Sequence, residues 1–122
     1  METLELARHF VRQLEDGSID GARGCLDANA EIWHDFDNKT QTADENMALF
    51  FWLVSKTKKR QYEITRLEAI TGGYLQQHTL KLTTLSGQEL TAYACCIVRV
   101  EKTKIVRIEE YINNTPLTAL SD

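Results

Sequence analysis

Hydrophobic residues in the first half of the chain recur every three or four positions, which is the spacing of one face of a helix. The clearest such stretch covers residues 4–14 and ends at an Asp-Gly pair, and a weaker one covers residues 18–26. Thr42 and Glu45 form a Thr-x-x-Glu capping box ahead of a third stretch that ends between residues 56 and 60. The pattern therefore predicts three helices.

From residue 61 onward the apolar residues alternate with polar ones, which is the pattern of strands with one buried face. Short polar or glycine-containing pairs separate the runs, as in an antiparallel meander. An earlier alternating stretch, residues 30–36, lies between the second and third predicted helices. The order of the predicted helices and strands along the chain indicates an α+β domain in which the helices cover one face of the sheet. The four later runs cover residues 61–70, 74–85, 88–101 and 104–112.

Alternation also predicts which side chains of the first strand face the core, because successive residues point to opposite sides. In "EIWHDFD", the more apolar set contains Ile32, His34 and Phe36. His34 is therefore predicted to point inward, and Asp35 and Asp37 outward. Only the histidine of this motif is left as a candidate for chemistry.

The second half of the chain adds two more ionisable residues to the predicted interior. In the run from residue 74, Tyr74 and His78 share the more apolar set, and in the run from residue 88 the small Ala94 leaves room beside them. The last run places Glu110 in the middle of an apolar set that starts at Val106. A buried carboxylate is costly without a partner, so Glu110 requires one.

Glu110, His34 and His78 would converge if the sheet and the helices enclose a cavity. Burial shifts the pKa values of such groups toward neutrality, which suits general acid or base catalysis. The same residues would serve equally as a structural ion pair in a closed core. Two histidines and a carboxylate can also bind a metal ion, but the short local spacings of metal motifs are missing, so we expect neither metal nor cofactor.

Composition excludes several partners. The 122 residues hold 14 Lys plus Arg and 18 Asp plus Glu, a net charge of −4, which gives no basic field for nucleic acid or an anionic membrane. "METLELARHF" lacks the apolar core of a secretion signal, and "MALFFWLV" is too short to span a bilayer. The spacing of the three cysteines fits no zinc site or redox motif, so we expect a cytoplasmic protein.

The order of elements, with "EIWHDFD" after two helices and "KIVRIEEYIN" at the end, resembles the SnoaL-like branch of the nuclear-transport-factor-2-like superfamily. The resemblance covers roughly residues 3–115 of a single domain, 1–122. It implies a cone-shaped, cystatin-like fold, in which a curved and mainly antiparallel sheet wraps around three helices and leaves a pocket at the open end. Members include polyketide cyclases, ketosteroid isomerases, epoxide hydrolases and non-catalytic binding modules.

The resemblance also implies roles for particular residues. His34 falls where ketosteroid isomerases keep their carboxylate base, and Glu110 matches the acidic residue of an Arg-Asp-Tyr-Phe-Asp segment in limonene epoxide hydrolases. Glu109 and Asn113 replace the arginine and the last aspartate of that segment. The resemblance further implies a homodimer through the outer face of the sheet, with Trp33, Leu75, Tyr93 and Ile97 at the contact.

Together these expectations describe a protein with a pocket for a small organic molecule. Glu110 would act as the base, and His34 as its acid or orienting partner. Further contacts to substrate are predicted for His78, Tyr74, Phe36, Phe51 and Ala94. The alternative is a non-catalytic, homodimeric ligand-binding or interaction module with the same fold.

Overall fold

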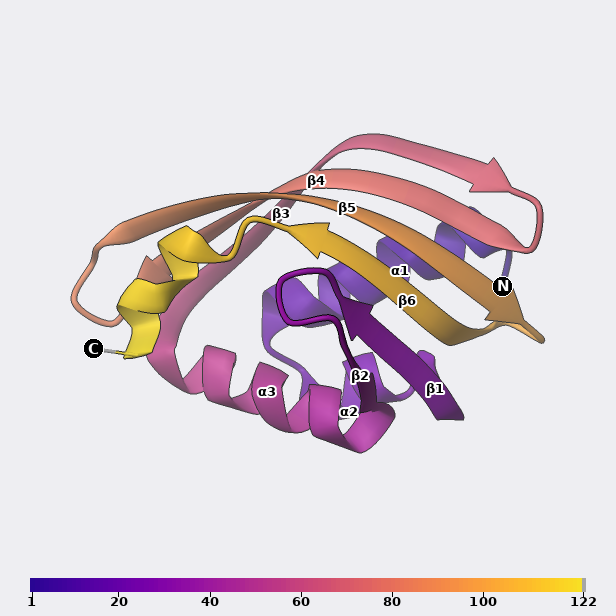
Figure 1. Cartoon of the computed structure of the whole chain (residues 1–122), viewed down its shortest axis with the longest axis horizontal. Helices are drawn as coiled ribbons and strands as arrows, with labels where there is room; N and C mark the ends of the chain where they lie inside the picture. Colours follow the sequence, from indigo (N-terminus) through magenta and orange to yellow (C-terminus); the bar gives the residue numbers. More distant parts are fainter. Residues whose placement is uncertain (122) are drawn as a thin grey trace.

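In the computed structural model, which describes residues 1–121, helices lie against the concave face of one curved sheet (Figure 1). The helices are α1 (Thr3–Asp16), α2 (Ile19–Arg23) and α3 (Ala43–Lys56). A 3₁₀ helix, η1 (Thr115–Ser121), follows the last strand and lies at one end of the sheet. No helix among residues 1–121 is long and apolar enough to cross a membrane.

The sheet has six strands in the order β2-β1-β6-β5-β4-β3. Every neighbouring pair is antiparallel except β1 and β6, which run parallel, so the predicted meander of the last four strands is present. The α+β prediction, with a curved and mainly antiparallel sheet, is confirmed. The strands are β1 (Leu26–His34), β2 (Lys39–Thr42), β3 (Thr57–Ile70), β4 (Gly73–Thr84), β5 (Glu89–Glu101) and β6 (Lys104–Ile112).

Several boundaries differ from the sequence prediction. The second helix ends at Arg23, and the chain is already extended at Leu26, where β1 begins. β3 begins at Thr57, directly after α3, although its polar start gave no alternating signal. The short strand β2 was missed because its residues 39–42 are all polar. Residues 115–121, expected to be a tail, form η1, whose Leu120 is buried against the sheet.

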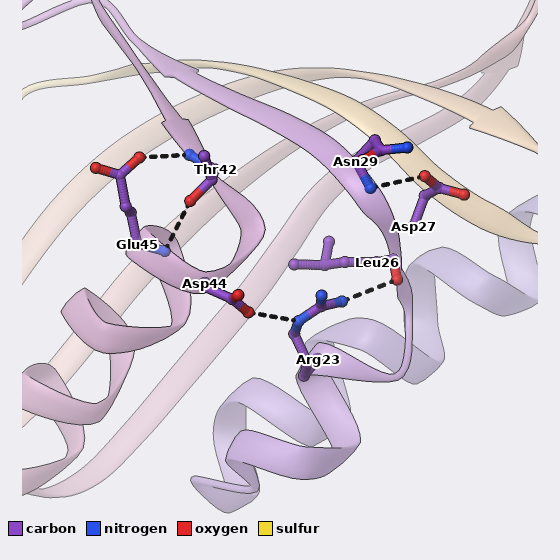
Figure 2. Close-up of polar contacts among 7 residues, drawn as sticks. All are labelled: Arg23, Leu26, Asp27, Asn29, Thr42, Asp44 and Glu45. Atoms are coloured by element: carbon purple, nitrogen blue, oxygen red, sulfur yellow. Dashed lines mark hydrogen bonds and ion pairs between the residues drawn. The ribbon is translucent and has the colours of Figure 1, made fainter.

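The start of α3 is fixed by side-chain contacts that Figure 2 shows. Thr42 accepts a hydrogen bond from the backbone of Glu45, and Glu45 accepts one from the backbone of Thr42, which is the predicted capping box. Arg23 links this end of α3 to the start of β1, because its guanidinium donates to Asp44 (3.2 Å) and to the carbonyl of Leu26 (3.3 Å). These contacts fix where α3 begins and link that end of the helix to α2 and to the start of β1.

Two bulges change which side chains face inward. The register of β3 against β4 shifts between Ile64 and Arg66, so the inward set changes parity there. The register of β5 against β6 shifts at Val100, and Ile105 of β6 is fully buried. The prediction that Val106 faces inward is therefore wrong, because an extra residue in a strand reverses the faces on one side of the bulge.

The buried residues form three clusters, and residues of all three line a cavity. The larger cluster packs α1, α2 and α3 against the sheet and contains Tyr74, Ile32 and Ile105, each almost fully buried. A smaller cluster lies at the η1 end, where Leu120 packs with Leu80, among others.

Candidate functional site

Four polar side chains form one row across the concave face of the sheet. His34 of β1 pairs with Glu110 of β6, Glu110 pairs with Cys96 of β5, and Cys96 pairs with Gln76 of β4. All four line the same cavity. Because paired residues in neighbouring strands point to the same face, this register brings together side chains that are up to 76 residues apart in sequence (110 − 34).

Within the row, His34 and Glu110 form an ion pair. The distance between Nε2 of His34 and Oε1 of Glu110 is 3.2 Å, and their side chains are 7% and 23% exposed. The other carboxylate oxygen, Oε2, accepts a hydrogen bond from the thiol of Cys96 at 3.5 Å. The structure therefore places the two predicted catalytic residues in direct contact, with the carboxylate more accessible than the imidazole.

The pair shifts the pKa of each partner toward the charged form, so the expectation that burial moves the pKa of Glu110 toward neutrality is wrong. Burial acts to lower the pKa of His34, but the hydrogen bond and the charge of Glu110 outweigh it, and Asp37 and Asp35 add to the rise above 6.5. Burial acts to raise the pKa of Glu110, but the hydrogen bond and the charge of His34 outweigh it and hold the value below 4.5. Near pH 6 the pair is an imidazolium facing a carboxylate.

We expect an NMR titration to give His34 a pKa above 6.5, and the variant Glu110→Gln to bring it below that value. Without the carboxylate, the burial of the ring is the dominant influence and favours its neutral form. Asp37→Asn is the matched control, since it removes only a more distant charge and should lower the pKa less. A wild-type pKa below 6.5 would contradict the ion pair.

The loop after β1 holds this pair in place. The backbone nitrogen of Asp35 donates to the carbonyl of Glu110, and its carboxylate accepts from the backbone nitrogen of Ile112, both at 3.0 Å. Asp35 thus attaches the end of β1 to the backbone of β6 on either side of Tyr111, directly after Glu110. The prediction that Asp35 points away from the interior agrees with its exposure, and this backbone contact gives it a structural role.

His78 lies beside the row, in contact with Gln76. Nδ1 of His78 is 2.9 Å from the amide nitrogen of Gln76, and Nε2 is buried without a hydrogen-bond partner in the part of the chain that the structure describes. Burial lowers the pKa of His78, although Glu110 acts in the opposite direction. The two imidazole rings therefore differ: that of His34 favours its charged form, and that of His78 favours its neutral form.

The cavity in front of these residues has a volume of about 430 Å³, within the range of small-molecule sites. The sheet forms its floor, and apolar residues of the helices form its walls. Figure 1 shows α1 and α3 beneath the arch of the sheet and η1 at one end of it. The helical residues at the wall include Phe10, Val11, Phe50, Leu53, Leu117 and Leu120.

The residues predicted to contact a substrate divide into two groups. His78, Tyr74 and Phe36 line the cavity, and the ring of Phe36 lies 5.2 Å from that of His34. Phe51 and Ala94 lie outside the lining, so their predicted place is wrong. Phe51 is 65% exposed because the apolar run "MALFFWLV" covers more than one face of α3, and Ala94 packs against Ile112 in a separate cluster.

Comparison with solved structures gives several close matches in fold. A protein of Shewanella putrefaciens CN-32, provisionally assigned as a SnoaL-like polyketide cyclase, matches with a TM-score of 0.82 and 7% identity, over 99% of this chain and 97% of that one. An NTF2-like protein of unknown function from Burkholderia pseudomallei K96243 matches with a TM-score of 0.80 and 14% identity, over 98% of both chains. The chain has the nuclear-transport-factor-2-like fold.

A third match is an epoxide hydrolase of the limonene epoxide hydrolase type from Mycobacterium tuberculosis, with a TM-score of 0.78 and 13% identity, over 97% of this chain and 87% of that one. No protein-family model and no curated protein sequence matches the chain. At these identities the likeness shows the nuclear-transport-factor-2-like fold alone, and the fold hosts more than one activity.

Three residues of the site were not singled out from the sequence. Gln76 and Cys96 belonged to the predicted inward sets, but neither residue type on its own signals chemistry. Tyr62 of β3 lines the cavity with its ring 5.3 Å from that of His78, and burial raises the pKa of its phenol. The sequence could not assign Tyr62 to the inner face, because the bulge in β3 leaves the run 61–70 without a consistent apolar face.

Among residues 1–121, the His, Cys, Asp and Glu side chains include no group of three that could hold a metal ion. Cys25 and Cys96 are buried free thiols, and burial raises the pKa of each. A raised pKa leaves little thiolate, the form that binds metals and acts as a nucleophile.

The outer face of the sheet carries the residues predicted to form a dimer contact. Trp33, Ile97 and Leu75 lie in one row across β1, β5 and β4, with Glu109 of β6 between the first two. Trp33 packs edge-on against Tyr111 with ring centroids 5.3 Å apart. Tyr93, further along β5, is 71% exposed.

Proposed function

We propose that this protein binds a small, largely apolar organic molecule in the cavity and that Glu110 and His34 perform acid-base chemistry on it without a cofactor. The observation that carries the proposal is an ion pair between a buried imidazole and a partly buried carboxylate on the floor of a cavity with apolar walls. A pocket with a few converging polar groups and shifted pKa values is the usual form of a small-molecule site. Isomerisation, cyclisation, dehydration and hydrolysis are the reaction types that fit.

Glu110 is the group that meets the ligand. Its lowered pKa keeps the carboxylate ionised at neutral pH, so it can accept a proton from a carbon or an oxygen of the ligand and return it to another atom. His34 is the more buried partner and orients the carboxylate through the 3.2 Å contact. Its positive charge stabilises negative charge that develops on the ligand nearby.

One observation favours a second candidate, a ligand-binding module without catalysis. Both carboxylate oxygens of Glu110 already accept hydrogen bonds, one from His34 and one from Cys96. A fully partnered carboxylate is also what a stable core network requires. The two candidates share the ligand and the cavity, and differ in whether the ligand is changed.

A thermal-shift screen with neutral, drug-sized organic compounds tests the proposal. Compounds that bind in the cavity should raise the melting temperature of the wild type, because a ligand that binds only the folded state stabilises it. Glu110→Gln, which preserves the shape of the side chain, should lose the shift for those compounds that contact the carboxylate. Glu109→Gln, one residue away on the outer face, is the matched control and should keep it.

Two results would contradict the proposal. One is a screen without a single hit on the wild type, and the other is a set of hits that Glu110→Gln leaves unchanged. Chromatographic analysis of each hit after incubation then separates the two candidates. A compound converted by the wild type but not by Glu110→Gln identifies an enzyme, and bound compounds that are recovered unchanged identify a binding module.

We also propose that the outer face of the sheet mediates a homodimer. Trp33, Leu75, Ile97 and Tyr93 support this, because they form an apolar surface across three strands, and such surfaces usually mark contacts with other proteins. Sedimentation velocity should show a dimer for the wild type and a monomer for the double variant Leu75→Glu with Ile97→Glu. Leu85→Glu, at an exposed residue in the β4–β5 turn, should remain dimeric, and a monomeric wild type would contradict the proposal.

A further inference from the structure

Gln76 has a fixed position on the floor of the cavity. It is 5% exposed, and it lies in the row that also contains Cys96 and Glu110. Its amide nitrogen is 2.9 Å from Nδ1 of His78, the next inward residue of β4. The contact holds the amide nitrogen toward the ring and leaves the carbonyl oxygen Oε1 on the other side of the amide.

This orientation of the amide determines the tautomer of His78. An amide nitrogen can only donate a hydrogen bond, so Nδ1 of His78 accepts and the proton of the neutral ring lies on Nε2. Burial keeps the pKa of His78 below 6.5, and the ring therefore stays neutral at pH 7. With one N–H engaged by His78, the amide of Gln76 offers a ligand its carbonyl oxygen Oε1 as an acceptor and keeps the second N–H of the same nitrogen as a donor.

Glu110 presents acceptors of the same kind. An ionised carboxylate can only accept, and it lies two strands away from Gln76 in the same row. Its neighbours His34 and Cys96 already direct their donors to it. Within residues 1–121, the cavity lining contains no lysine or arginine, and the ion pair of Glu110 and His34 has no net charge. Oε1 of Gln76 and the carboxylate of Glu110 therefore suit an uncharged molecule that brings its own hydrogen-bond donor.

We propose that Gln76 recognises a hydroxyl group of the ligand through Oε1, and that the ligand is an uncharged, largely apolar alcohol or phenol. His78 is the positioning residue, because its ring fixes the amide of Gln76. A molecule of the same shape with only acceptor atoms leaves Oε1 without a donor, which costs binding free energy. The inference rests on the proposed function, since it requires that the cavity holds a small molecule.

Calorimetric titration with two probes of nearly equal shape tests the inference. 1-Indanol carries a hydroxyl group, and 1-indanone carries only an acceptor oxygen. The wild type should bind 1-indanol about tenfold more tightly, the value of one well-made hydrogen bond. The ratio of the two dissociation constants is the readout, because a general loss of stability affects both probes alike.

Variants then assign that preference to one side chain. Gln76→Met keeps the length of the side chain and should bring the ratio of the two dissociation constants close to one. Gln76→Asn is a milder change that withdraws the carbonyl by one methylene, and it should have the same effect. Gln77→Met is the matched control, since Gln77 is the next residue of β4 and faces the opposite side of the sheet. His78→Phe should lower the ratio without changing Gln76 itself.

Each result has one meaning. Loss of the preference in Gln76→Met and Gln76→Asn, with the preference kept in Gln77→Met, supports the inference. A wild type without the preference, or a preference that survives in Gln76→Met, overturns the inference and leaves the proposed function intact. A wild type that binds neither probe overturns the inference and also counts against the proposed function.

Discussion

Replacement of Tyr74 by alanine is expected to lower the free energy of unfolding by about 3–5 kcal/mol. Tyr74 is 1% exposed and belongs to the larger core cluster, where the sheet packs against the helices. Removal of its ring enlarges the cavity and deletes contacts that the surrounding residues cannot replace. Urea denaturation at pH 7, followed by circular dichroism, measures the loss.

Tyr93→Ala is the matched control for this substitution. Tyr93 lies on the opposite face of the sheet and is 71% exposed, so its replacement should change the free energy of unfolding by no more than about 0.5 kcal/mol when the protein is kept monomeric by dilution. A loss for Tyr74→Ala as small as that for Tyr93→Ala would contradict the assignment of Tyr74 to the core.

The second large effect concerns the ion pair. A double-mutant cycle with His34→Gln and Glu110→Gln should give a coupling free energy of about 1.5–3 kcal/mol near pH 6, as for a hydrogen bond between charged groups. The energy is expected at the upper part of this range because the imidazole is 7% exposed and the carboxylate 23%. Urea denaturation of the four proteins supplies the cycle.

The dependence of this coupling on pH follows from the two pKa shifts. The raised pKa of His34 contributes stability that is present below 6.5 and is lost as the pH rises through the folded value. The lowered pKa of Glu110 contributes stability that is present above 4.5 and is lost as the pH falls through the folded value. The coupling should therefore be largest between pH 4.5 and 6.5, and a constant coupling from pH 5 to pH 9 would contradict the ion pair.

His78 affects overall stability in the opposite direction from His34. Its lowered pKa means that the unfolded chain binds a proton more readily, so acidification below 6.5 destabilises the folded protein. The double-mutant cycle removes this contribution, because His78 is present in all four proteins. The pH profile of the wild type alone would mix the two histidines.

The sequence predicted well which side chains face inward where the strands alternate without interruption. In β1 alternation assigned Ile32 and His34 to the inner face, and in β6 the same rule singled out Glu110. The contact between His34 and Glu110 could not be read from either strand alone. It depends on the parallel pairing of β1 with β6, a long-range feature that local patterns do not specify.

Prediction failed where local irregularity or long-range packing decides the structure. The bulge in β3 reverses the faces within one run, so Tyr62 could not be assigned to the cavity. The polar residues of β2 become a strand only because β1 lies beside them. Leu120 is buried because η1 folds back onto the sheet. The sequence did not predict this, because the segment that forms η1 is short, has a proline near its start and shows no periodic pattern of apolar residues.

Phe51 shows a further limit of pattern reading. Adjacent apolar residues such as Phe50 and Phe51 cannot both lie on one face of a helix, and the sequence does not say which of them is buried. The structure buries Phe50 in the cavity wall and leaves Phe51 65% exposed. Tertiary packing, and not hydrophobicity, makes that choice.

The central claim is that a small organic molecule binds beside Glu110, and a crystal structure with a compound from the thermal-shift screen tests it most directly. We predict the compound in the cavity between the sheet and helices α1 and α3, with a polar atom within hydrogen-bond distance of the carboxylate of Glu110 and its apolar part against Phe10 and Phe50. Density for the compound on the outer face of the sheet, with the space beside Glu110 filled by side chains, would contradict the claim.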